Sequence, residues 1–344
     1  MKTRVPFVAL FALLLAGGNV SAASFSNLYT FGDSLSDVGS SPSAEMSLYD
    51  ILFDNCDLSH PCGPYFDGRF SNGPVATEYL AKSLFPGGAN FHSYAVAGAT
   101  TGVGNIGDGG TATKEGEPFL IPVPGLFPLP GMKGELEQYM EDSDRQADPN
   151  ALYFIWGGAN DYGTSDSPTM AAQNISGYVN QLAAAGAEHI LVPNLGDLSH
   201  LPSVRAEGAE VQALAQAFSL SFNGALAAGL GDVSSQFPAA EIYQFDTYSF
   251  LNEFIASPPG NVTDVQNACL SGDDTVCADP ASHLWWDGLH PTTSAHSVIA
   301  SGFASAVPEP GIYAMFIAGL FVLGIAGNRR RNLATSQVNE RGTS

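Results

Sequence analysis

Basic side chains are scarce in this chain of 344 residues. Twelve lysines and arginines stand against 34 aspartates and glutamates, which gives a formal net charge of −22 at pH 7. Proteins that bind nucleic acid or anionic lipid need clustered Lys and Arg, and such clusters are missing from the middle of the chain. The composition therefore excludes nucleic acid as a partner. It suits an exported, soluble protein or one that lives in salt.

Cysteine is also sparse, with four residues in two close pairs, Cys56 with Cys62 and Cys269 with Cys277. Four cysteines allow three connectivities, and local pairing, which closes two short loops, is the interpretation we favour. The spacing is wider than the Cys-x-x-Cys of zinc sites, so no metal is expected here. Disulfides require an oxidising compartment.

The N-terminus has the three regions of a secretory signal peptide. Lys2 and Arg4 precede an apolar run over residues 5–16, and small residues follow. We predict that residues 1–23 are removed on export, with cleavage after Ala22 or Ala23. The alternative is a buried N-terminal helix.

The C-terminus carries a second targeting pattern. Residues 307–310 read Val-Pro-Glu-Pro and precede an apolar stretch over 311–327 that ends at three arginines. The stretch is near the lower end of the length that spans a membrane as a helix, and the arginines would hold that end in the cytoplasm. The tail resembles the PEP-CTERM sorting signal of Gram-negative bacteria that make exopolysaccharide.

This resemblance implies that residues 307–331 hold the protein transiently in the inner membrane. An exosortase would then recognise the segment and deliver the protein to the cell surface or the exopolysaccharide matrix. The short polar tail over residues 332–344 departs from the pattern, because such signals usually stop soon after the arginines. A plain C-terminal membrane anchor is the alternative.

The body between residues 24 and 306 shows no repeats and is predicted to be one domain. Short apolar runs separated by loop and helix signals are typical of buried parallel strands. Strands that alternate with helices predict an open parallel sheet covered on both sides, with the ligand site beyond the carboxyl ends of the strands. The predicted strands are Leu28 to Phe31, Phe91 to Val96, Ala151 to Trp156, His189 to Val192, and Glu241 to Phe245.

Three helices are predicted, over about residues 170–185, after Pro202, and over 294–304. The second takes Ser203 as its N-cap. Two stretches break the pattern, at 40–73 and 102–134; the second is rich in Gly, Pro and apolar residues and is either a mobile lid or a loop packed on the body. The apolar face of the second helix is expected to hold Val204, Val211, Leu214, Phe218, Phe222 and Leu226.

A serine follows the first predicted strand in the segment Phe31-Gly-Asp-Ser-Leu-Ser-Asp37. A glycine bend at a strand end presents the Ser34 hydroxyl to the crevice, where a helix N-terminus stabilises negative charge. Asp33 and Asp37 are expected to stabilise this turn. A plain N-cap role for Ser34 is the alternative.

A histidine in the segment Trp286-Asp-Gly-Leu-His-Pro291 supplies the base that a serine needs. Asp287 lies three residues before His290, and in a tight turn its carboxylate can accept the imidazole N–H and fix the tautomer. A structural surface turn is the alternative.

Donors for an oxyanion follow two other strands. An ester attacked by Ser34 develops negative charge on its carbonyl oxygen, which backbone N–H groups and a side-chain amide can bind. Asn160 supplies the amide, while Gly98 and Ser34 supply backbone N–H groups. Asp161 is expected to hold the adjoining loop through hydrogen bonds to backbone N–H groups.

These four segments, in this order and spacing, resemble the four blocks of the GDSL, or SGNH, hydrolase family over about residues 27–306. The resemblance implies a three-layer α/β/α sandwich with a mostly parallel, flavodoxin-like sheet and no metal or cofactor. By match, Ser34 is the nucleophile, His290 the base and Asp287 its orienting partner. The segments 68–74 and 192–198 resemble the lipase-type branch of plant GDSL lipases and bacterial lecithinase/haemolysin-like enzymes, with Gly196 where that branch often has Pro.

The sequence thus predicts an exported esterase or lipase that cleaves acyl or phospholipid esters. A deacetylase of acetylated exopolysaccharide and a non-catalytic matrix-binding protein are the alternatives. A metal site formed by His283, His290 and His296 is disfavoured, because these residues are expected in different local elements. For Trp285 and Trp286 both an acyl pocket and plain packing are open, with packing favoured.

Overall fold

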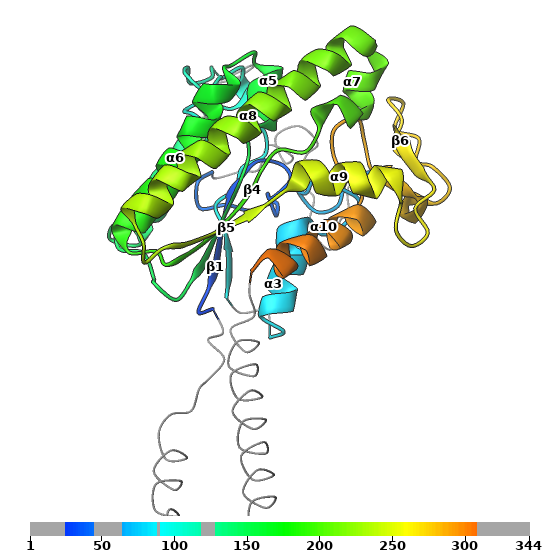
Figure 1. Ribbon diagram of the computed structural model, residues 1–344. Helices are drawn as coiled ribbons and strands as arrows, with labels where there is room; N and C mark the ends of the chain where they lie inside the picture. The colour runs from blue at the N-terminus through cyan, green and yellow to red at the C-terminus, as the bar shows by residue number, and fades with distance from the viewer. Residues whose placement is uncertain (1–24, 45–63, 88–89, 118–127, 308–344) are drawn as a thin grey trace, which may run out of the picture. The chain divides into compact units, whose positions relative to one another are not determined.

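The computed structural model describes residues 25–44, 64–87, 90–117 and 128–307 (Figure 1). Several predictions lie outside the described residues. They are the signal peptide, the sorting segment from residue 308 onward, the Cys56–Cys62 pair, and the apolar residues between 119 and 127.

Five short strands form one parallel sheet in the order β2-β1-β3-β4-β5, which is the flavodoxin-like order that the sequence predicted. Each pair is parallel, and the register sets Leu28 of β1 beside Leu152 of β3. A second, two-stranded sheet joins β6 and β7. The bounds are β1 Leu28–Gly32, β2 Phe91–Ser93, β3 Leu152–Trp156, β4 His189–Pro193, β5 Glu241–Phe245, β6 Asp264–Ala268 and β7 His283–Trp285.

The central strands are mostly apolar because both of their faces are largely buried. In β3 all five residues are buried, and alternate side chains enter different cores. Leu152, Phe154 and Trp156 pack on one side, and Tyr153 and Ile155 on the other. The predicted sheet covered on both sides is therefore confirmed.

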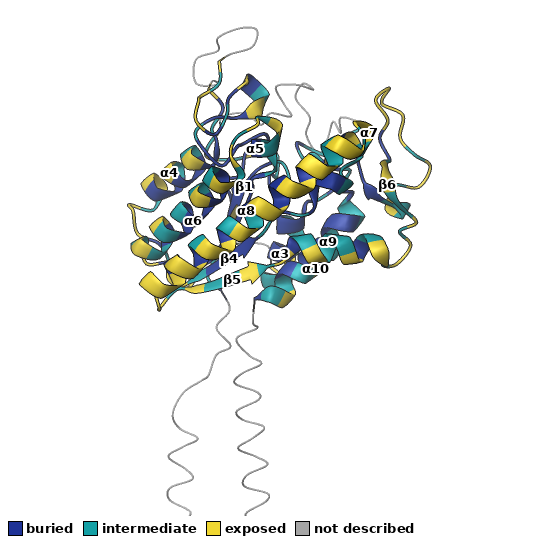
Figure 2. Ribbon diagram, turned by 45° about the horizontal axis from the view of Figure 1, so that its top comes forward, coloured by how far each residue is buried: buried dark blue, intermediate teal, exposed yellow. Residues whose placement is uncertain are grey.

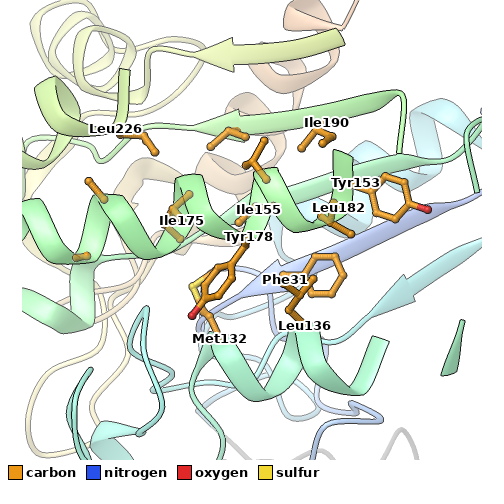
Figure 3. Packing of buried hydrophobic residues seen from close by; sticks show 14 of the residues in the cluster. Phe31, Met132, Leu136, Tyr153, Ile155, Ile175, Tyr178, Leu182, Ile190 and Leu226 are labelled. Atoms are coloured by element: carbon orange, nitrogen blue, oxygen red, sulfur yellow. The ribbon is translucent and has the colours of Figure 1, made fainter. Parts of the chain in front are cut away.

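Two layers of helices cover the sheet. Figure 1 shows α6 and α8 on one side of the strands and α3 and α10 on the other, and Figure 3 shows side chains of α4, α6 and α8 packed together over the sheet. The helix bounds are α3 Ala76–Leu84, α4 Met132–Asp142, α5 Ala159–Gly163, α6 Pro168–Ala185, α7 Pro202–Ala206, α8 Ala209–Gln236, α9 Thr247–Ala256 and α10 Thr293–Ala306, with 3-10 turns η1 Ile106–Asp108, η2 Leu198–His200 and η3 Pro280–Ser282.

The helix predicted after Pro202 differs from the structure in three ways. Ser203 is not an N-cap, because Pro202 already occupies the first helical turn of α7. The helix is also interrupted at Gly208, whose φ of 98° does not continue a helix, so α8 starts afresh. Leu214 is 61% exposed, and Ala215 takes the inward position instead.

Strand β2 is shorter than predicted, ending at Ser93 rather than Val96. The chain nevertheless stays bonded to β1, because the Val96 N–H donates to the carbonyl of Gly32. The same N–H also donates to the carboxylate of Glu135 at 3.1 Å. The hydrogen bond to Glu135 thus lies beyond Ser93, where the regular pairing of β2 with β1 has ended.

Among the described residues, one helix, α8, is long and apolar enough to cross a membrane. Its buried side chains pack on α6, as expected of a core helix in a folded domain. The exposed residues of α8 follow its outer face (Figure 2).

Two leucines of α8 give a matched test of this packing. Leu226 is 2% exposed and Leu214 is 61% exposed. Leu226→Ala should lower the free energy of unfolding by about 2–5 kcal/mol, because it leaves a cavity between α8 and α6. Leu214→Ala should change it by less than about 0.5 kcal/mol. Urea denaturation followed by circular dichroism measures both, and equal losses would show that α8 does not pack as described.

Candidate active site

The candidate site lies at the carboxyl ends of β1 and β3. In the strand order β2-β1-β3-β4-β5, the connection from β1 leads to one side of the sheet, and the later strands are added on the other side of β1. Ligands bind at such a topological switch point, which here lies between β1 and β3. Ser34 follows β1 by two residues, and Asn160 is the second residue of α5, which begins three positions after the end of β3. The turn before α5 requires Gly158, whose φ is 116° and whose added Cβ would strike Phe222.

Ser34, His290 and Asp287 form a continuous chain of hydrogen bonds. The Ser34 Oγ lies 2.8 Å from His290 Nε2. The other ring nitrogen, Nδ1, lies 2.7 Å from Asp287 Oδ2. With Nδ1 protonated and bonded to the carboxylate, Nε2 is free to accept the serine proton. The arrangement can therefore activate a hydroxyl for attack on a carbonyl carbon.

The turn that carries Asp287 and His290 is held by the same carboxylate. Asp287 Oδ1 accepts the backbone N–H groups of Leu289 and His290, each at 2.7 Å. Burial alone would raise the pKa of Asp287, but the charge of His290 and these hydrogen bonds outweigh it and lower the pKa to about 2. The carboxylate is therefore ionised at neutral pH.

A tyrosine that the sequence analysis missed completes the shell of Asp287. The Tyr65 hydroxyl donates to Asp287 Oδ2 at 2.8 Å. Tyr65 is separated from Asp287 by 222 positions and belongs to none of the motifs, so no local pattern signals its role. Its ring also contacts Phe70, whose own ring lies 5.2 Å from that of His290.

The segment 68–74 packs directly against the turn of the histidine. Ser71 Oγ donates to the carbonyl of Pro291 at 3.0 Å, and Asn72 Oδ1 accepts the N–H of Thr293 at 2.8 Å. Any side chain at Gly73 would collide with Thr293. This segment thus fixes the distance between the turn of the histidine and the rest of the domain.

The three predicted oxyanion donors follow three neighbouring strands of the sheet, with Ser34 after β1, Gly98 after β2 and Asn160 after β3. Ser34 and Asn160 both line the same cavity, whereas Gly98 is not among its lining residues. Asn160 Nδ2 donates to the carbonyl of Ala99 at 2.9 Å, which fixes the amide and leaves its second N–H available. Gly98 has a φ of 82°, a conformation that favours glycine.

Buried carboxylates support the loops around Ser34. Asp37 accepts the N–H groups of Gly39 and Ala97, as expected of a residue that stabilises the turn. Asp33 accepts the N–H of Leu35, and burial raises its pKa to about 6.

Glu135 of α4 is a second residue that the sequence analysis missed. It is fully buried and accepts the N–H groups of Gly32 at 2.8 Å and Val96 at 3.1 Å, so it joins β1 to the chain after β2. Burial raises its pKa well above the usual value. A glutamate within a helix ordinarily indicates a solvated face, which is why the pattern did not reveal it.

Asp161, His283 and His296 hold parts of the fold together through hydrogen bonds. Asp161 accepts both the N–H and the hydroxyl of Thr101, as expected. His283 begins β7 and contacts the Ser282 hydroxyl, while His296 lies buried in α10, where its Nδ1 accepts the N–H of Ala76. Burial, followed by the charge of His290, lowers the pKa of His296 to about 3.

Trp285 and Trp286 are neighbours in the chain but have different roles in the structure. Trp285 lines the cavity, and its indole N–H donates to the carbonyl of Val265. Trp286 packs in a small cluster beside a disulfide that joins Cys269 to Cys277. Packing is therefore the structural role of Trp286, and Trp285 belongs to the wall of the site.

A cavity of about 280 Å³ opens beside Ser34. Ser34, Asn160 and His290 line this cavity, and apolar side chains form most of the rest of its wall. These apolar residues include Leu198, Leu201, Phe250, Leu251, Phe254, Leu284 and Trp285. The site therefore offers a reactive hydroxyl next to a mostly apolar space.

A hydroxyl, an imidazole and amide donors at the strand ends of a three-layer α/β fold are the equipment of a hydrolase that works by acyl transfer. The sequence model of the GDSL-like lipase/acylhydrolase family matches residues 28–303, and the chain belongs to this family.

Three relatives illustrate the range of the match. An uncharacterized protein of the trpE-trpG intergenic region of Pseudomonas putida is 29% identical over 328 residues, covering 88% of this chain and 52% of that protein. A phosphatidylcholine-sterol acyltransferase of Aeromonas hydrophila is 29% identical over 278 residues, which cover 79% of this chain and 73% of that protein. A GDSL esterase/lipase of Arabidopsis thaliana is 25% identical over 330 residues, which cover 86% of this chain and 92% of that protein. The chain thus spans about half the length of the first.

The low pKa of Asp287 predicts a specific loss of stability in acid. Its folded pKa of about 2 lies below its unfolded value, so its stabilisation is present above about pH 4 and is lost as the pH falls toward 2. Between pH 4 and 2 the free energy of unfolding should fall by about 2 kcal/mol more in the wild type than in Asp287→Asn. Denaturant melts measure the free energy of unfolding at each pH. If it fell equally in the wild type and in Asp287→Asn, the low pKa assigned to Asp287 would be contradicted.

The hydrogen bond from Tyr65 predicts a positioning role. Tyr65→Phe should lower kcat for ester hydrolysis about tenfold with little change in KM, because the carboxylate loses a partner that fixes its orientation. Tyr79→Phe is the control, since that hydroxyl bonds to Thr293 and not to the carboxylate. Steady-state kinetics that show equal effects of the two substitutions would argue against the role.

Proposed function

We propose that this protein is an exported serine esterase or lipase in which Ser34 is the nucleophile, His290 the general base and Asp287 its orienting carboxylate. One observation carries the proposal. The hydroxyl, the imidazole and the carboxylate are linked by contacts of 2.8 Å and 2.7 Å at the wall of a mostly apolar cavity.

The reaction is an acyl transfer in two steps. Ser34 Oγ attacks the ester carbonyl while His290 Nε2 takes its proton, and the imidazolium then protonates the departing alcohol. Water, deprotonated by His290, attacks the acyl-enzyme, and the imidazolium returns the proton to Ser34 Oγ as the bond to the acyl group breaks and the acid leaves. The ionised Asp287 stabilises the imidazolium in both steps.

Negative charge on the carbonyl oxygen is bound in our mechanism by the N–H groups of Ser34 and Gly98 and by the side-chain amide of Asn160. The bond from Asn160 to the carbonyl of Ala99 supports this, because it holds the amide rigid before substrate arrives. Donors fixed in advance avoid reorganisation when the charge develops.

We infer acyl or phospholipid esters as the substrate class. The apolar wall supports a substrate with a fatty chain, and one relative is named a phosphatidylcholine-sterol acyltransferase. The segments 68–74 and 192–198, which resemble the lipase-type branch, point the same way.

Targeting completes the proposal. Residues 1–23 act as a signal peptide, residues 24–306 form the hydrolase domain, and residues 307–331 act as a PEP-CTERM segment that anchors the chain in the inner membrane until an exosortase processes it. The same tail favours one competing function, deacetylation of an acetylated exopolysaccharide. Comparing hydrolysis of a phospholipid with that of an acetylated glycan separates the two.

The nucleophile assignment predicts the behaviour of a serine variant. Ser34→Ala should abolish hydrolysis of p-nitrophenyl butyrate and covalent labelling by a fluorophosphonate probe, because it removes the hydroxyl that attacks the carbonyl. Ser301→Ala is the control, an exposed serine of α10 whose hydroxyl bonds within its own helix. Labelling that persists in Ser34→Ala would refute the assignment. The absence of both labelling and hydrolysis in the wild type would favour a non-catalytic matrix-binding role.

A further inference from the structure

Much of the cavity wall outside the reactive groups comes from three separate parts of the chain. The loop after β4 continues through η2 to the start of α7, α9 supplies Phe250, Leu251 and Phe254, and β7 supplies Leu284 and Trp285. Helix α9, β7 and α10 share a cluster of buried side chains, so this part of the wall is a packed unit. The space is therefore bounded by residues of the folded domain.

The chemistry of this wall fits an aliphatic chain. Asp197 also lines the space, but its carboxylate already accepts the N–H of Ser199 at 3.0 Å and Nε2 of Gln216 at 2.9 Å. Outside the reactive groups, the other lining residues that carry a hydroxyl or carboxyl group are Asp33, Tyr162, Ser203 and Thr247. Two of them already have partners, because Asp33 accepts the N–H of Leu35 and the Tyr162 hydroxyl donates to the carbonyl of Val211. A sugar ring brings several hydroxyls that each need a partner once buried, and this wall supplies too few.

The size of the cavity sets the length of such a chain. Its volume is 280 Å³. An apolar cavity of ~150 Å³ holds one benzene molecule, so the space beside Ser34 has room for roughly ten carbon atoms. A chain of about that length fills it, and a longer chain has to leave through the opening.

Gly196 keeps this space open. It lines the cavity, and a Cβ at this position would lie 3.0 Å from Leu251 Cδ2 and 3.8 Å from the methyl group of Thr247. Its backbone is outside the left-handed region, so a larger residue can be accommodated without backbone strain. A side chain here would meet α9 and shorten the space.

We propose that the cavity binds a single aliphatic chain of about ten carbons from the ester substrate, and that the missing side chain at Gly196, opposite Leu251, sets the accepted length. This inference rests on the proposed esterase function. The chain belongs either to the acyl group or to the alcohol, and the two sources share the same chemistry.

Two ester series test the proposal with the wild type. The first keeps the p-nitrophenol leaving group and extends the acyl group from acetate through butyrate, octanoate and decanoate to hexadecanoate. The second keeps acetate and extends the alcohol from ethanol to decanol. In one series kcat/KM should rise about fourfold per methylene until about ten carbons and then stop rising. The series that rises identifies the source of the chain.

Substitution at Gly196 tests what sets the length. Gly196→Val should lower the ratio of kcat/KM for decanoate to that for acetate, or the equivalent ratio in the alcohol series, at least tenfold. Adding Leu251→Ala to Gly196→Val should restore most of this ratio by returning the lost space. Gly224→Val is the control, because an added Cβ on that glycine of α8 meets nothing within 4 Å.

A binding measurement separates this inference from the proposed function. Trp156 and Trp285 line the cavity, so 1-octanol should change the tryptophan fluorescence of Ser34→Ala, ethanol should not, and Gly196→Val should abolish the response. Hydrolysis of acetate esters with no rise in either series and no octanol response overturns the inference alone. Octanol binding without ester hydrolysis or fluorophosphonate labelling supports the chain site and overturns the esterase.

Discussion

The hydrogen bond between Ser34 and His290 joins two segments that lie 256 positions apart in the chain. Both ends of this bond must be fixed within a fraction of an ångström, because proton transfer depends on that distance. On the serine side, β1 is paired on both edges and Glu135 holds its last residue. On the histidine side, Asp287 closes the turn and the segment 68–74 packs against it. The domain thus acts as a rigid frame for one contact.

This frame breaks ordinary rules of stability where the site requires it. Carboxylates are seldom fully buried, yet Asp33 and Glu135 lie buried next to the loop of Ser34. Burial raises the pKa of both groups, so each costs stability when it ionises. Each also satisfies backbone N–H groups of loops that cannot use a regular ladder. Local stability is exchanged here for a fixed geometry, as is common near functional sites.

Much of the fold was readable from the sequence because its physical causes are local. Strands β1, β3 and β4 lie inside the sheet and are mostly buried, so they are nearly continuous apolar runs, and the edge strands β2 and β5 still carry enough apolar residues to be recognised. The motifs after the strands were therefore expected at one edge of the sheet. Register and the outward position of Leu214 were not readable, since they depend on packing against distant elements. The break at Gly208 is local, but a single glycine inside a helical pattern is ambiguous. Tyr65 and Glu135 form hydrogen bonds to residues more than 100 positions away in the chain, so neither their spacing nor their residue type predicts these contacts.

The central claim is that Ser34, its activating histidine and a set of amide donors surround a single reacting centre. The structure of the protein after reaction with an alkyl fluorophosphonate tests it most directly, because the phosphoryl group imitates the tetrahedral intermediate. We predict a bond from phosphorus to Ser34 Oγ, a phosphoryl oxygen about 3 Å from the N–H groups of Ser34 and Gly98 and from Asn160 Nδ2, and His290 Nε2 still beside the adduct. An adduct on another residue, or a phosphoryl oxygen turned into solvent away from Asn160, would contradict the account.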